Sequence, residues 1–192
     1  MSFFMHSFLS YPHYLYIMTT NKNEKIIEAK KLSKQALWFF ILSHFIFLAL
    51  YIFFWGYKGL WHQLLEFAAW FLWLFIPSIV VHEGLHGLIW AIPNHWKNIR
   101  FGFNRNLMAP YTHCTIPLKK WHYWLGGMMP GILMGVIPAV YAISVGNIQI
   151  LYWGIFYTWT AAGDFISCWH VLKEKNDSLI LDHPDELGYV VQ

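Results

Sequence analysis

Charged residues are scarce in this chain of 192 residues. Asp, Glu, Lys and Arg together make up 12% of the sequence, whereas hydrophobic residues make up 57% and aromatic residues 20%. A soluble domain has roughly 25% charged residues, and a soluble fold of this size could not cover its surface with half that share. A membrane protein has less surface to expose to water. The composition therefore predicts a membrane protein of one domain.

Two further shortages exclude classes of function. The only two cysteines, Cys114 and Cys168, lack the paired spacing of a disulfide framework or of a cysteine-based zinc site, so we expect two unpaired thiols. The formal net charge of +3 is too small to indicate binding to nucleic acid.

The N-terminal segment does not have the pattern of a secretory signal. Its first 20 residues contain no Lys or Arg and no cleavage site of small residues, so we expect no cleavage. The segment is either a loosely structured tail or an extension before a true start near Met18.

Long apolar runs predict four membrane-spanning helices. A helix needs about 20 apolar residues to cross a bilayer. Runs of this length cover residues 36–55, about 64–92, about 122–145 and about 148–172. Trp and Tyr gather near the ends of these runs, as expected for residues at the membrane interface. The sequence therefore predicts an all-α fold with four transmembrane helices.

The positive charges predict the orientation of these helices. Twelve of the 13 Lys and Arg residues precede the first helix, lie between the second and third, or follow the fourth. Lys58 is the exception. Loops rich in Lys and Arg stay in the cytoplasm, so both termini are expected there. We therefore expect a multi-pass protein of the cell membrane, with cytoplasmic tails at residues 1–34 and 173–192 and a membrane domain at 35–172.

Two acidic residues, Glu83 and Asp164, lie well inside the apolar runs. Inserting an ionisable side chain at such depth costs about 2.5–3.5 kcal/mol, so such a residue usually marks a functional site. Glu83 belongs to the motif HEGLH at residues 82–86. Because side chains at i and i+4 share a helix face, His82 and His86 can bind one zinc ion. Glu83 can then deprotonate a water bound to the metal.

Asp164 is the predicted third ligand. A catalytic zinc site needs three protein ligands and one open position. Residues 82–86 and Asp164 each lie about 6–10 residues from the inner end of their run, or about 9–15 Å at 1.5 Å per residue. This matching depth favours Asp164. We expect the adjacent Gly163 to let a neighbouring helix approach closely.

Three other side chains are candidates for contact with the substrate or with a ligand. His44 lies in the first run at a similar depth, although a packed, hydrogen-bonded histidine is the commoner case. Tyr111 and His113 lie in a proline-bounded, extended segment at residues 110–117, which could approach the site from the cytoplasm. Either could help to hold an oxyanion; the alternative for His113 is an ordinary loop residue.

These motifs resemble the site-2 protease type of intramembrane zinc metallopeptidase. The chain resembles more closely a bacterial family described as "putative zincin peptidase", over about residues 35–189. That family combines HExxH, a Gly-Asp pair in the last span and an Asp-His-Pro…Gly tail. In this sequence they are residues 82–86, Gly163-Asp164, and Asp182-His183-Pro184 with Gly188.

The resemblance implies that His82, His86 and Asp164 bind zinc and that Glu83 is the general base. The chain departs from the site-2 pattern, because Gly163 precedes Asp164, whereas a glycine usually follows that aspartate. We also expect the C-terminal tail to pack near the cytoplasmic mouth of the site.

The expected function is hydrolysis of membrane-embedded or juxtamembrane peptide bonds by a zinc-activated water. Two alternatives remain open. A transporter or proton relay would use Glu83, Asp164 and His44 and would bind no zinc tightly. A pseudoenzyme would bind zinc and cleave nothing. The expected partners are the lipid bilayer and a membrane protein or peptide substrate, without nucleic acid.

Overall fold

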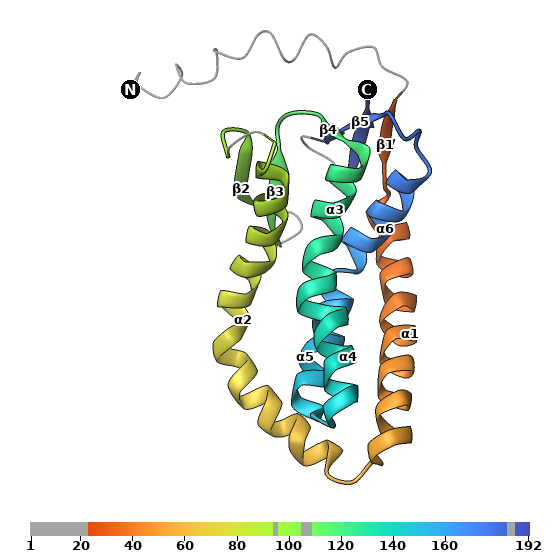
Figure 1. Cartoon of the computed structure of the whole chain (residues 1–192), viewed down its shortest axis with the longest axis vertical. Coiled ribbons are helices and arrows are strands. Elements are labelled where there is room, and N and C mark those ends of the chain that lie inside the picture. Colours follow the sequence, from red (N-terminus) through yellow and green to blue (C-terminus); the bar gives the residue numbers. More distant parts are fainter. Residues whose placement is uncertain (1–22, 94–95, 105–108, 184–186) are drawn as a thin grey trace.

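The computed structural model describes residues 23–93, 96–104, 109–183 and 187–192. Within these residues, long helices form a bundle, and short strands gather at one end of it, which we call the sheet end (Figure 1). Met18, the predicted alternative start, lies outside the described residues. Pro184 of the tail motif lies outside them as well.

Three helical segments are long and apolar enough to cross a membrane. They are Lys30–Trp55, Leu60–Ala91 and Lys120–Val145. The first two correspond to α1 (Ala29–Trp55) and α2 (Leu60–Ala91). The third consists of α3 (Lys120–Pro130), a π-helical stretch η1 (Gly131–Val136) and α4 (Ile137–Val145). These segments confirm three of the predicted spans and agree with a membrane location.

The fourth predicted span is divided into two helices. Helix α5 (Ile148–Thr160) has 13 residues and α6 (Ala162–Leu172) has 11, and Ala161 separates them. Each is shorter than the roughly 20 residues that a spanning helix needs, so a count of four spans is not confirmed. The sequence did not reveal the break because alanine is the best helix former.

Two small antiparallel sheets correct the prediction of an all-α fold. One sheet has the order β1-β6-β5-β4, and β2 and β3 form the other. Their bounds are β1 Glu24–Ile26, β2 Ile99–Asn104, β3 Ala109–Cys114, β4 Leu118–Lys119, β5 Leu179–Asp182 and β6 Gly188–Val191. These strands are too short for their pattern to stand out in a sequence, and two of the four in the larger sheet, β1 and β4, pair only with strands distant along the chain.

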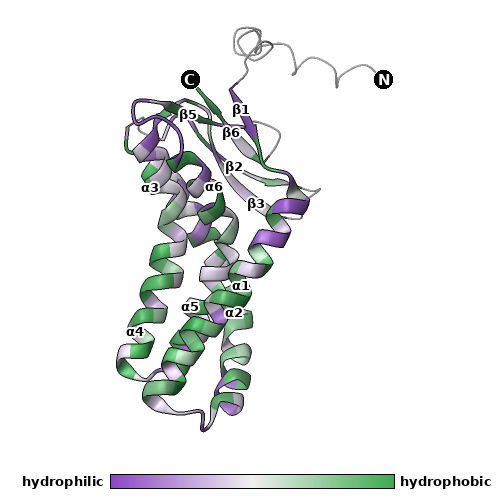
Figure 2. Ribbon diagram, turned by 90° about the vertical axis from the view of Figure 1, so that its right-hand side faces the viewer, coloured by the Kyte–Doolittle hydropathy of each residue, from purple (hydrophilic) through white to green (hydrophobic). Residues whose placement is uncertain are grey.

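The pairing of β1 with β6 brings the first and last described residues to the same end of the bundle. The bounds of the predicted tails and membrane domain stay predictions, although the two tails meet in this sheet. Figure 2 shows hydrophobic colour along the helices and hydrophilic colour concentrated toward the sheet end.

The helices expose large apolar side chains, whereas the sheet end has a conventional core. Trp73 is 84% exposed and Phe53 is 80% exposed, as expected for side chains that face lipid. At the sheet end, a buried cluster joins the strands to the helices. Its members are Trp90, Cys114, Leu118, Tyr123, Val171, Ile180 and Tyr189.

Lys120 joins the start of α3 to the end of α6. Its side chain is buried, and its ammonium group donates hydrogen bonds to the carbonyl oxygens of Leu172 (2.9 Å) and Glu174 (2.6 Å) and to Asn176 Oδ1 (3.2 Å). A buried charge is tolerated when it is hydrogen-bonded in this way. The ammonium group also lies at the C-terminus of α6, where a positive charge interacts favourably with the helix dipole.

Glycines allow α3 to pack closely against its neighbours. A Cβ atom at Gly126 would collide with the Trp90 indole, and one at Gly127 would lie 2.5 Å from the Cys168 sulfur. By contrast, a Cβ atom at Gly163 would meet nothing within 4 Å. The prediction that a neighbouring helix approaches closely at Gly163 was therefore wrong. The close approaches occur at Gly126 and Gly127 of α3 instead.

Candidate metal centre

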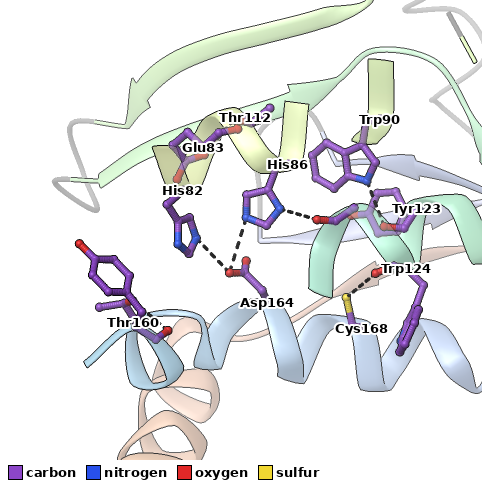
Figure 3. Close-up of polar contacts among 12 residues, drawn as sticks. His82, Glu83, His86, Trp90, Thr112, Tyr123, Trp124, Thr160, Asp164 and Cys168 are labelled. Carbon is purple, nitrogen blue, oxygen red and sulfur yellow. Dashed lines mark hydrogen bonds and ion pairs between the residues drawn. The ribbon is translucent and has the colours of Figure 1, made fainter. Parts of the chain in front are cut away.

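Helices α2 and α6 bring His82, His86 and Asp164 together. The two histidines lie one turn apart on α2, and Asp164 lies in the first turn of α6, directly after the break at Ala161. Asp164 Oδ2 is 3.3 Å from His82 Nε2 and 3.6 Å from His86 Nε2. Figure 3 shows the three side chains pointing toward one another.

This arrangement fits a bound divalent metal ion. One ligand atom from each of the three residues lies within 4.8 Å of the others. Zinc binds nitrogen and oxygen at about 2.0–2.2 Å, so tetrahedral ligand atoms are about 3.3–3.6 Å apart. Two imidazoles and a carboxylate with one position left open are the donor set of catalytic zinc sites. Elsewhere in the described part of the chain, no other group of this kind occurs.

A backbone carbonyl fixes the orientation of His86. Its Nδ1 donates a hydrogen bond to the carbonyl oxygen of Gly126 on α3, at 2.9 Å. Because a carbonyl can only accept, Nδ1 carries the proton, and Nε2 is the ring nitrogen that faces Asp164. Metal-binding histidines commonly have such a partner on the other ring nitrogen. His86 itself is buried.

Thr112 holds the carboxylate of Glu83. The hydroxyl of Thr112, on β3, lies 2.9 Å from Glu83 Oε2 and 2.8 Å from the Glu83 carbonyl oxygen. Thr112 was not among the predicted site residues, although both of its neighbours, Tyr111 and His113, were. Successive side chains of a strand point to opposite faces, so the face of β3 that meets α2 carries Thr112 rather than Tyr111 or His113.

The three other candidates do not join the cluster. His113 Nδ1 lies 3.3 Å from Asp182 Oδ2, and the Tyr111 ring packs over Gly102 of the adjacent strand β2. His44 Nδ1 donates to the carbonyl oxygen of Phe40 in its own helix, at 3.1 Å. A role in substrate contact stays a prediction for these residues.

The C-terminal tail reaches the helices next to the centre. Asp182 Oδ1 accepts a hydrogen bond from the Tyr123 hydroxyl at 2.6 Å, and Oδ2 lies 3.3 Å from the Cys114 backbone nitrogen. Neither Cys114 nor Cys168 forms a disulfide, as expected, and both are buried. Burial raises the pKa of the Cys114 thiol, so this residue stays protonated near neutral pH.

Comparison with known proteins gives a match to a protein family. Residues 75–179, more than half of the chain, match the family described as "Putative zincin peptidase". The matched segment includes His82, Glu83, His86 and Asp164, but it ends before the tail motif at Asp182. No curated protein and no solved structure matches the chain, and the likeness to site-2 proteases gains no support from these comparisons. The chain therefore belongs to the "putative zincin peptidase" family.

Proposed function

We propose that this protein is an intramembrane zinc metallopeptidase that hydrolyses peptide bonds within or beside the membrane. The observation that carries the proposal is the convergence of His82, His86 and Asp164 in a group of apolar helices, with Glu83 next to the first ligand. The family description supports a peptidase in general. Glu83 favours catalysis, because a structural zinc site closes all four positions and needs no base.

His82, His86 and Asp164 would hold the zinc ion, and Glu83 would move the proton. When bound, zinc acidifies a water molecule and polarises the carbonyl group of a substrate. Glu83 accepts the proton from the attacking water and returns it to the leaving amine. Thr112 orients the Glu83 carboxylate through its hydrogen bond to Oε2.

The proposed setting is a multi-pass membrane domain with both termini in the cytoplasm. The elements that carry most of the Lys and Arg residues meet at the sheet end, whereas Lys58 lies between α1 and α2 at the opposite end (Figure 1). The centre lies near the sheet end, since His86 is close to the C-terminus of α2. The substrate is a membrane-embedded or juxtamembrane peptide, which must unwind locally because helical hydrogen bonds occupy its carbonyl groups. The resemblance to site-2 proteases belongs to the same proposal.

Metal content and cleavage, measured together, test the proposal. Protein purified in detergent without chelator is expected to hold about one zinc ion per chain. After reconstitution with single-span membrane peptides, mass spectrometry should detect fragments that disappear with 1,10-phenanthroline and return with zinc. A protein without metal would contradict the proposal and favour a transporter or proton relay. Zinc without cleavage across the peptide set would indicate a pseudoenzyme.

Thr112→Val is expected to lower cleavage about 10–100-fold while the zinc content stays unchanged. Valine keeps the shape of threonine but removes the donor to Glu83, and loss of such a supporting hydrogen bond typically has an effect of this size. The measurement is the initial rate of peptide cleavage at equal zinc content.

Thr115→Val is the matched control for this prediction. The Thr115 hydroxyl donates to the carbonyl oxygen of Asn98 at 3.2 Å, so the same substitution removes a comparable hydrogen bond next to the same strand. Equal losses in the two variants would show that Thr112 has no special role in placing Glu83.

A further inference from the structure

A stack of three rings runs from the candidate metal centre toward the C-terminal tail. The rings of His86 and Trp90 have centroids 5.3 Å apart with an interplanar angle of 21°. Trp90 and Tyr123 follow at 5.3 Å and 15°. All three residues are at most 7% exposed, so the rings have little freedom to move. Figure 3 shows this series beside Asp164.

Hydrogen bonds to α3 lock the stack in place. The Trp90 indole donates to the carbonyl oxygen of Tyr123 at 3.0 Å, as His86 does to that of Gly126 at 2.9 Å. Both acceptors belong to α3. The position of α3 therefore determines the orientation of both rings, and Gly126 leaves room for the indole.

Asp182 anchors the far end of the stack. Its Oδ1 accepts from the Tyr123 hydroxyl at 2.6 Å, and its Oδ2 faces the Cys114 backbone N–H and His113 Nδ1, each at 3.3 Å. A carboxylate that is largely removed from water requires such donors, and hydrogen bonds to a charged group are among the stronger ones in proteins. One tail residue thus joins α3, β3 and β5.

We propose that Asp182 is a positioning residue for the metal centre. By holding Tyr123, it fixes the stack that orients the imidazole of His86, and so a residue of the C-terminal tail contributes to metal affinity. The inference rests on the part of the proposed function that assigns zinc to this site. It assigns a role to a tail residue outside the segment that matches the family.

Tyr189 provides a control for a purely structural role of this network. It belongs to the same buried cluster as Tyr123, and its hydroxyl also donates to a carboxylate, Glu174 Oε1, at 3.0 Å. Glu174 lies just after the end of α6, so this hydrogen bond does not connect Tyr189 to the ring stack. Tyr123→Phe and Tyr189→Phe therefore remove the same group from the same cluster with different connections to His86.

The experiment measures zinc affinity by chelator competition, and the visible spectrum of the Co²⁺-loaded form, on the full chain in detergent. Tyr123→Phe and Asp182→Asn are expected to weaken zinc binding about 10-fold, the lower end of the usual effect of supporting residues, and to alter the Co²⁺ spectrum. Tyr189→Phe should leave both readouts unchanged, while the two Tyr→Phe variants lose thermal stability to a similar extent.

Equal zinc affinity in Tyr123→Phe and Tyr189→Phe would overturn the inference. If Tyr123→Phe does not fold, the same comparison is made with Asp182→Asn, whose neutral amide can accept only a weaker hydrogen bond from the tyrosine than the carboxylate does. Because the readout is metal affinity, the inference can hold in a protein that binds zinc and cleaves no peptide, a result that defeats the proposed function alone. Absence of zinc from the unmodified protein overturns both.

Discussion

Glu83→Gln is expected to abolish most peptide cleavage and to leave zinc binding intact. Glutamine has nearly the same shape and its amide oxygen can still accept from Thr112, but it cannot take a proton from water. General acid–base groups contribute about 10²–10⁴-fold to a rate, and the loss of cleavage should fall in that range. Because Glu83 is not one of the three proposed ligands, about one zinc ion per chain should remain.

The measurement is the single-turnover cleavage rate of a reconstituted membrane peptide at equal zinc content. Glu66→Gln is the control. Glu66 is on the same helix, but it lies near the start of α2, whereas the motif lies near its end. Its Oε2 also accepts a hydrogen bond, from Gln149 Nε2 at 2.8 Å. Unchanged cleavage in Glu83→Gln would exclude this residue as the base. Loss of zinc in that variant would instead make Glu83 a ligand.

Asp164→Ala is expected to lower zinc affinity by at least about 100-fold, beyond the 10–100-fold effect of residues that only support a ligand. The substitution removes the carboxylate oxygen that lies 3.3 Å and 3.6 Å from the Nε2 atoms of His82 and His86. Two imidazoles one turn apart would remain, which is one ligand fewer than catalytic zinc sites use. The variant purified without added zinc should therefore contain almost none.

Elemental analysis and chelator competition measure this effect. Asp177→Ala serves as the control, because Asp177 is an exposed aspartate in the turn that follows α6. His86→Ala should lose zinc as Asp164→Ala does. Retention of one tightly bound zinc ion by Asp164→Ala would mean that the third ligand is another residue.

The parts of the site that depend on local spacing could be predicted from the sequence. The interval between His82 and His86 places both rings on one helix face whatever the helix packs against, because the period of the helix is set by the backbone. Asp164 required one further assumption, that residues at equal depth in a membrane can meet. The structure brings its carboxylate to both histidines, although α6 begins only at Ala162 and is not the continuous span on which the depth was counted.

The parts that depend on distant pairing could not be predicted. Thr112 reaches Glu83 only because β3 lies against α2. Along β3 the side chain of Thr112 points to one face and those of Tyr111 and His113 point to the other, but the sequence does not show which face meets the helix. The position of Asp182 depends on the pairing of β5 with β4 and β6, strands of two and four residues. Such short strands have no detectable periodicity before they pair.

Composition and local spacing were thus enough to predict a mostly helical membrane protein, three of its apolar spans and a candidate metal-binding motif, whereas the family was predicted from the resemblance of its motifs. These properties follow from the solubility of side chains and the period of a helix, and both act along the chain. The break at Ala161, the two sheets, the contact between Thr112 and Glu83 and the ring stack from His86 to Tyr123 depend on which surfaces meet. Only the folded chain determines these features. The contacts join residues that are remote in sequence, and local propensity does not predict the break at Ala161.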